Sequence, residues 1–216
     1  MLNFSAETII NILLSIAALL LVFTVHECAH GYAAYLLGDT TAKDAGRLSL
    51  NPIKHLDPFG ALCLLIFRFG WAKPVPINPY RFKSFRLGTA LCSLAGPLSN
   101  VIFAFLVNLI WDILFYMNVS VNPYVVSFLQ ILYVYNLSIA VFNLIPIPPL
   151  DGSKILLSVL PQKAYTFVLN YERYGFILLI VLLWTNLLNG ILNTGVNNLM
   201  MLLGNMSGGI LSLFWR

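Results

Sequence analysis

The sequence predicts an all-α polytopic membrane protein with about four to five transmembrane helices. Hydrophobic residues make up 59% of the 216 residues and charged residues only 9%, whereas soluble domains carry about 25% charged residues. The chain also contains several long uncharged runs, and about 20 apolar residues are enough to cross the hydrocarbon core as a helix. Finally, three ionisable side chains lie at the end of the first run. Ionisable groups are costly within a membrane helix, so their presence indicates a functional site.

The uncharged runs give four predicted spans, with a turn in the sequence NVSVNPY (118–124) between the second and the third. The predicted spans are residues 8–30, 88–115, 124–146 and 174–192. The first run has no basic start and no convincing cleavage site, so we interpret it as a retained helix and not as a signal peptide.

The C-terminal segment 196–215 is ambiguous, because GNMSGG (204–209) is expected to interrupt a helix. It is a fifth span, a re-entrant piece or a surface helix. We expect the whole chain, residues 1–216, to form a single domain embedded in the lipid bilayer.

The region 38–87, between the first two predicted spans, differs from an ordinary loop. FGALCLLIF (59–67) is apolar but too short to cross the membrane, which indicates a re-entrant or interfacial segment. The flanking stretches 42–52 and 71–82 combine Gly and Pro with alternating apolar residues. They predict short strands or a β-hairpin close to the membrane surface.

The distribution of Lys and Arg predicts the orientation in the membrane. The region 38–87 carries eight of the twelve, the segment 147–173 carries three, and the turn 118–124 carries none. Because basic segments stay on the cytoplasmic side, we expect a multi-pass protein of the cell membrane with its N-terminus outside. The net charge of +4 is then explained by topology, and no nucleic-acid partner is expected.

The sequence HECAH occupies residues 26–30 at the end of the first predicted span. Residues four apart share one face of a helix, so the imidazoles of His26 and His30 lie about 6 Å apart along the axis and can hold one Zn²⁺ ion per chain. Glu27 is placed to act as a general base on the water that zinc activates, as in the H-E-x-x-H zinc hydrolases. Each ionisable group within a bilayer costs on the order of 2.5 kcal/mol or more unless it is satisfied. Metal binding explains this group better than a structural hydrogen-bond cluster, the alternative interpretation.

A catalytic zinc site usually has three protein ligands and one open position. The third histidine, His55, follows NPIK and precedes LDPFG in an expected turn, which makes it a poor candidate. The better candidate is Asp151, which follows the third predicted span after Pro146, Pro148 and Pro149 have stopped the helix. The first and third spans both run from outside to inside, so Asp151 and the histidines are expected on the same side of the membrane.

These motifs together resemble the site-2 proteases, the family of intramembrane zinc metalloproteases. The resemblance rests on HECAH (26–30), NLIPIPPLDG (143–152), AGPLSN (95–100), GRLSLNPIKHLDPFG (46–60) and GWAKPVPINPYRF (70–82). It covers nearly the whole chain and is closest to small bacterial and archaeal members, without a PDZ insertion or a nucleotide-sensing domain. The resemblance implies that His26, His30 and Asp151 bind zinc and that Glu27 is the catalytic base.

The resemblance also points to two asparagines. Asn143, before the Pro-rich turn, is implied to hold the substrate backbone or to help stabilise the oxyanion, with an ordinary helix–helix contact as the alternative. Asn100 belongs with Gly96 to the central helix of the family, where it either orients the site or joins neighbouring helices. Cys28, Cys63 and Cys92 are far apart, and we expect them to be buried and unbridged.

The expected reaction is hydrolysis of a peptide bond in a transmembrane protein or peptide, near the cytoplasmic side. The substrate helix must unwind first, which Gly or Pro makes easier, and we expect the stretches 40–55 or 71–82 to pair with the unwound peptide. Two alternatives are a membrane transporter or channel, because ionisable groups within membranes often mark ion pathways, and a catalytically silent pseudoprotease that only binds helices. The intact Glu27 argues against the second alternative.

Overall fold

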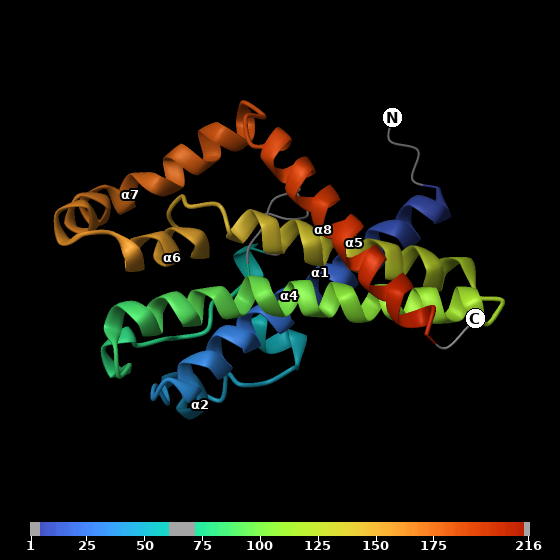
Figure 1. The fold of residues 1–216 in the computed structure, drawn as a ribbon, viewed down its shortest axis with the longest axis horizontal. Helices are drawn as coiled ribbons and strands as arrows, with labels where there is room; N and C mark the ends of the chain where they lie inside the picture. The colour runs from blue at the N-terminus through green and yellow to red at the C-terminus, as the bar shows by residue number, and fades with distance from the viewer. Residues whose placement is uncertain (1–4, 61–71, 214–216) are drawn as a thin grey trace.

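The computed structural model describes residues 5–60 and 72–213 and is built from helices (Figure 1). In chain order the elements are α1 (Ala6–Leu36), α2 (Thr41–Asp44), the 3-10 helices η1 (Pro52–His55) and η2 (Pro79–Arg81), α4 (Phe85–Tyr116), α5 (Pro123–Asn143), α6 (Asp151–Val159), α7 (Gln162–Trp184) and α8 (Asn189–Leu211). No strand forms in the described ranges. The chain is an all-α membrane protein, as predicted.

Helices α1, α4 and α5 are each long and apolar enough to cross a membrane. They cover the first three predicted spans. Helix α1 begins after Ser5, whose Oγ accepts a hydrogen bond from the Thr8 N–H at 3.2 Å, and Asn122 caps α5 in the same way. Helix α5 ends at Asn143, three residues before the predicted end of the third span at 146, because the proline-rich segment that follows cannot continue a helix.

Helix α4 is the central element, and it packs against α1, α5 and α6 (Figure 1). Helices α1 and α5 also contact each other. Ala18 and Val22 of α1 form a buried cluster with Val107 of α4 and Leu132 of α5. Because this cluster joins all three long helices, it fixes the position of the end of α1 relative to the end of α5.

The fourth predicted span, residues 174–192, is not one straight helix. Helix α7 ends at Trp184, α8 begins at Asn189, and the segments Arg173–Trp184 and Asn189–Leu211 meet at 83°. Asn186, in the turn between them, has φ 59°, a left-handed conformation that Asn tolerates better than most residues. The bent pair makes up a fourth span only if its two limbs are counted together.

The C-terminal segment is not interrupted, although an interruption at GNMSGG was expected. Helix α8 runs without a break through GNMSGG to Leu211. Gly204, Gly208 and Gly209 have no neighbour within 4 Å of the position a Cβ would take. Three glycines in a helix weaken it, but tertiary contacts override such propensities, and α8 packs on α4 and α5.

The region between α1 and α4 contains short helices and extended backbone. Leu56 and Ala72 form an isolated antiparallel bridge, and residues 73–78, which we call the strap, have no regular secondary structure. Pro74 and Pro76 explain this, since neither has an N–H for a β-ladder. The predicted re-entrant segment 59–67 lies largely outside the described residues, so that part remains a prediction.

Asp39 fastens the strap to the end of α1. Its buried carboxylate accepts hydrogen bonds from the Asn78 N–H at 2.6 Å, from the Thr41 N–H at 3.0 Å and from the Thr41 hydroxyl. The Arg81 guanidinium lies 3.8 Å away. Burial by itself raises the pKa of Asp39, but the Thr41 and Asn78 hydrogen bonds and the Arg81 charge outweigh it and hold this pKa below its usual value.

Replacing Asp39 with Asn should therefore destabilise the fold. The amide turns one acceptor into a donor facing an N–H, so we expect the free energy of unfolding to fall by about 1–3 kcal/mol, measured as a lower Tm in detergent micelles. Because the pKa of Asp39 is lowered on folding, its contribution is present above the unfolded pKa and is lost as the pH falls through the folded pKa. The difference in Tm between wild type and D39N should be constant above about pH 5 and shrink below about pH 4.

The matched control is D44N. Asp44 is exposed and accepts a hydrogen bond from Thr40 at 2.7 Å, so its replacement should change stability by no more than about 0.5 kcal/mol. A D39N protein as stable as D44N at pH 7 would show that Asp39 does not fasten the strap.

Candidate metal centre

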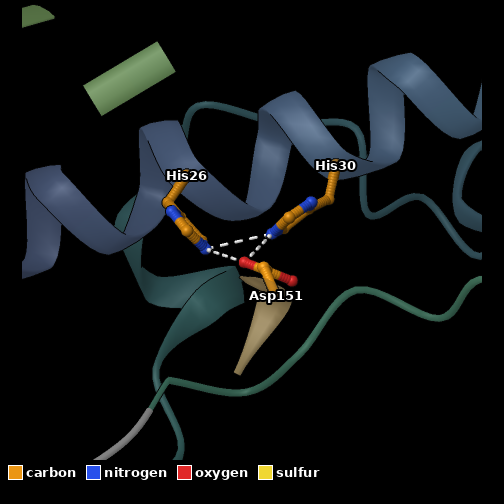
Figure 2. Close-up of side chains that lie close together, drawn as sticks. All are labelled: His26, His30 and Asp151. Carbon is orange, nitrogen blue, oxygen red and sulfur yellow. Dashed lines mark hydrogen bonds and ion pairs between the residues drawn. The ribbon is translucent and has the colours of Figure 1, made fainter. Parts of the chain in front are cut away.

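Three side chains from two distant parts of the chain converge on one point (Figure 2). The Nε2 atoms of His26 and His30, both on α1, lie 3.0 Å apart. Asp151, the first residue of α6, places its Oδ2 3.2 Å from His26 Nε2 and 3.1 Å from His30 Nε2. All three residues are buried. Among the described residues, they form the group of His, Cys, Asp and Glu side chains that is arranged to hold a metal ion.

The separations between these three atoms fit a zinc ion. With zinc–ligand distances of about 2.0–2.2 Å, two ligands of a tetrahedral site lie about 3.3 Å apart. The three observed separations are 3.0–3.2 Å, so the side chains need to move apart by only a few tenths of an ångström to hold the ion. Two imidazoles and a carboxylate are also a donor set that zinc prefers.

The His30 ring is held by helix α4. Its Nδ1 lies 2.7 Å from the Cys92 carbonyl oxygen, which only accepts hydrogen bonds, so Nδ1 carries the proton and donates it. Nε2 then has a free lone pair that faces Asp151. A backbone carbonyl behind a histidine is a common way to orient a metal ligand.

The His26 ring is approached by Asn100 of the same helix. The Asn100 Nδ2 lies 3.4 Å from His26 Nδ1, while the Asn100 Oδ1 is buried and has no hydrogen-bond partner in the described part of the chain. A half-turn of the carboxamide would place this oxygen against His26 Nδ1. His26 would then donate from Nδ1, and its Nε2 would be free to bind a metal.

Gly96 allows α4 to lie directly against the two imidazoles. A Cβ at this position would be 2.6 Å from His26 Cε1 and closer still to His30 Nε2. Gly152 has the same role next to Asp151, since a Cβ there would be 2.5 Å from the Leu144 carbonyl carbon. The three helices can bring the three side chains together only because these two positions have no side chain.

Glu27 lies beside this cluster and is held by the strap. Its Oε2 accepts a hydrogen bond from the Val75 N–H at 2.8 Å. Glu27, both histidines and Asp151 line one cavity of about 580 Å³. A carboxylate held at one oxygen by a backbone N–H keeps its other oxygen for proton transfer with a water in the cavity.

Asn143 also lines this cavity, at the last turn of α5. It is partly buried, and its Nδ2 donates to the Ile139 carbonyl at 3.0 Å, which leaves its Oδ1 and the second N–H available to a ligand. Lys154, one turn after Asp151, lies with its Nζ 3.8 Å from Asp151 Oδ1. The Oδ2 of Asp151 faces the imidazoles.

His55 is not part of the cluster. Its Nε2 lies 2.7 Å from the Ser49 carbonyl oxygen and 3.6 Å from the Cys28 sulfur. Cys28 follows His26 by two residues, and a helix rotates about 200° over that interval, so His55 packs against the opposite side of α1. Cys28 and Cys92 are buried and free, as predicted, and Cys63 lies outside the described residues.

Two contacts of the site were not anticipated from the sequence. The Cys92 carbonyl and the Val75 N–H are backbone groups, and backbone groups leave no mark in the residue types of a sequence. The only available signal was indirect, in the alternation of Pro74, Val75 and Pro76, which leaves Val75 as an isolated donor.

Known proteins similar to this chain carry the name "Putative zinc metalloprotease". The family model "Peptidase family M50" matches residues 111–183, which include Asn143 and Asp151. A Bacillus subtilis (strain 168) protein named "Putative zinc metalloprotease YwhC" is 43% identical over 183 residues, which is 80% of each chain. "Putative zinc metalloprotease Rip2" of Mycolicibacterium smegmatis is 30% identical over 190 residues, covering 82% of this chain and 69% of the relative. No solved structure matches the chain significantly.

The Gly96 contact can be tested by adding one methyl group. In G96A the new Cβ would overlap both imidazoles, so we expect the affinity for zinc to fall at least about tenfold, measured by metal analysis of protein equilibrated with a chelator of known affinity. G204A is the control, since nothing lies within 4 Å of that Cβ position. Wild-type zinc affinity in G96A would mean that the histidines do not need this close approach.

Proposed function

Since the chain belongs to peptidase family M50, the site-2 proteases, and is an intramembrane zinc metalloprotease, we propose that His26, His30 and Asp151 hold its zinc and that Glu27 is its catalytic base. The observation that carries this proposal is the convergence of the three ligand atoms within 4.8 Å. Asp151 is 121 positions from the nearer histidine, His30, in the sequence, and each of the three residues is buried. The single domain that carries the site is residues 1–216.

Zinc, when bound, supplies a Lewis acid that activates water and polarises the scissile carbonyl. Glu27 takes the proton from the attacking water as the C–O bond forms, and it delivers this proton to the leaving nitrogen as the C–N bond breaks. The hydrogen bond from the Val75 N–H to Oε2 fixes the orientation of the carboxylate, so that Oε1 is the oxygen that carries the proton.

Asn143 and Asn100 have different roles in this proposal. Asn143 faces the cavity and donates to the substrate carbonyl or to the oxyanion that develops there. Asn100 is fully buried behind His26, where it orients the imidazole and does not reach the substrate. The sequence alone left a functional and a structural interpretation open for each asparagine. In this proposal Asn143 contacts the substrate and Asn100 positions His26.

The substrate is a transmembrane protein or peptide that unwinds before it is cut. The strap and the stretch 40–55 flank the site and offer backbone to the extended peptide. In the strap, Pro74 and Pro76 carry no N–H and the N–H of Val75 is engaged by Glu27. The strap therefore has few donors for a substrate, and specificity depends more on the ease of unwinding than on a side-chain code.

The site faces the cytoplasmic side, with the N-terminus of the chain outside. This orientation is supported by the positions of Lys and Arg, since eleven of the twelve lie within the two regions 38–87 and 147–173. The histidines lie near the end of α1 and Asp151 follows the end of α5, so both parts of the site lie toward the same basic regions. Cleavage then occurs in the cytoplasmic half of the substrate helix and releases a cytosolic fragment.

Replacing Glu27 with Gln should stop hydrolysis without removing the metal. The amide cannot accept the proton from water, so we expect kcat to fall by about 10²–10⁴-fold, with close to one zinc per chain retained. D151N, which weakens a ligand, should lose zinc as well as activity. The assay is cleavage of a purified single-span reporter with a Gly-Pro pair in its transmembrane segment. If E27Q cuts this reporter as fast as wild type, Glu27 is not the base, and if neither cuts it while zinc is bound, the chain is a pseudoprotease.

The orientation can be tested by labelling single cysteines in intact cells. In a chain whose native cysteines are replaced by alanine, V119C in the exposed turn after α4 should react with a membrane-impermeant maleimide, because no lipid or cytoplasm shields it. K163C, at the exposed start of α7, should react only after the cells are permeabilised. The reverse pattern, or product ends that map only to the outer half of the substrate helix, would refute the proposed orientation.

A further inference from the structure

Helix α8 carries a row of three asparagines on one face. Asn189, Asn193 and Asn197 are four residues apart, all three are exposed, and we call them the asparagine ladder. The side chains of Asn193 and Asn197 make no hydrogen bond within the described part of the chain. Helix α8 is one limb of the bent pair that is apolar enough to enter a membrane, where an unpaired carboxamide is costly.

The ladder lines a groove between α8 and α5. The groove has a volume of about 500 Å³, and α5 contributes Ser138, Ile139 and Phe142 to its wall. The groove lies one helical turn from the cavity of the candidate metal centre along α5, because Ile139 lines the groove and Asn143, one turn later on the same face of α5, lines the cavity beside Glu27. A chain lying in the groove would approach the site along α5.

The proposed reaction requires hydrogen-bond partners for the backbone of the unwound substrate within the membrane. An intact transmembrane helix satisfies its own backbone groups, but unwinding releases N–H and C=O groups that cost several kcal/mol each if they stay unpaired in a water-free environment. The strap supplies few donors because Pro74 and Pro76 have none and Val75 is engaged. A carboxamide provides both donors and an acceptor, which is what a released backbone needs.

The spacing of the ladder also matches an extended peptide. Residues four apart on a helix rise about 6 Å along its axis. Residues two apart on an extended chain, which point the same way, are about 6.6–6.8 Å apart. Successive asparagines can therefore meet successive backbone groups on one edge of an unwound segment.

We propose that the asparagine ladder binds the backbone of the unwound part of the substrate's transmembrane segment and so guides it from the groove into the site. This inference rests on the proposed function and deepens it, since it identifies where the chain compensates for the hydrogen bonds lost on unwinding. The occupant is the substrate segment in extended form, recognised through its main chain, so many different sequences fit provided that they unwind.

The first experiment measures contact and does not depend on activity. A photoreactive benzoylphenylalanine is introduced at position 193 of the full-length E27Q chain, and the protein is irradiated in lipid nanodiscs with the Gly-Pro reporter. We expect cross-links to the residues around the Gly-Pro pair, several-fold more than from position 198. Asn198 is exposed on α8 but does not line the groove, which makes it the matched control.

The second experiment measures the energetic effect on cleavage. Loss of one backbone hydrogen bond should reduce kcat/KM about fivefold, so the N193A/N197A double variant should lose about 25-fold against the reporter, if the two bonds are independent. N198A should stay within about twofold, and all variants should keep wild-type zinc content. N193Q/N197Q, which keeps the carboxamides, should recover part of the loss.

Several results would overturn the proposal. Equal cross-linking from positions 193 and 198, or cross-linking only to lipid or to a second copy of this chain, would show that the substrate does not occupy the groove. A double variant that cleaves as well as wild type would show that the ladder does not bind it. These results are distinct from failure of the proposed function, in which wild-type protein with bound zinc does not cleave the reporter at all.

Discussion

The architecture of this protein depends on bringing the Asp151 carboxylate to the two imidazoles of α1. Their contact, at 3.1 and 3.2 Å, joins elements that would otherwise meet only through side-chain packing. It requires α4 to lie against the histidines and the start of α6 to lie against the end of α5, and Gly96 and Gly152 permit both approaches. In a membrane the hydrophobic effect gives little drive to helix association, so close packing of this kind and the polar site it encloses account for much of the specificity of the fold.

The polar groups around this contact form a connected set. His30 donates to α4 through the Cys92 carbonyl, Glu27 accepts from the strap, and the strap is fastened by Asp39 beyond the end of α1. Each of these bonds satisfies a group that would be costly if left unpaired. The same set places the carboxylate of Glu27, the proposed base, so the bonds that stabilise the region between α1 and α4 also orient this carboxylate.

The grouping of His26, His30 and Asp151 was easier to predict from the sequence than the path of the chain. The ligand candidates followed from helical spacing and from prolines that end a helix, and both are local rules that depend on residue type. The membrane helices followed from uncharged runs. The corner at Asn186 was missed because the run 174–192 is uncharged throughout, and the absence of charge does not report a bend. The continuity of α8 through GNMSGG was missed because contacts with α4 and α5, which override local propensity, are not visible in the sequence. The predicted strands do not form in 42–52 or 72–82, where helix α2, turns and two prolines take their place. The re-entrant segment lies largely outside the described residues and remains a prediction.

Hydrolysis within a membrane raises a question of hydrogen-bond balance. A protease that cuts in water can rely on solvent to satisfy an unwound substrate, but a protease that cuts within the bilayer must provide the partners itself, and it must do so without preferring one side-chain sequence. Asparagines spaced along a membrane helix meet both conditions, because a carboxamide pairs with the main chain of any residue. A strap interrupted by Pro74 and Pro76 does not, since it has few donors for a substrate. If the unwinding step limits the rate, the ease with which a segment unwinds determines which substrates are cut. The amides of α8 then lower the cost of unwinding for any sequence, and the zinc chemistry determines only how fast a segment is cut once it has arrived.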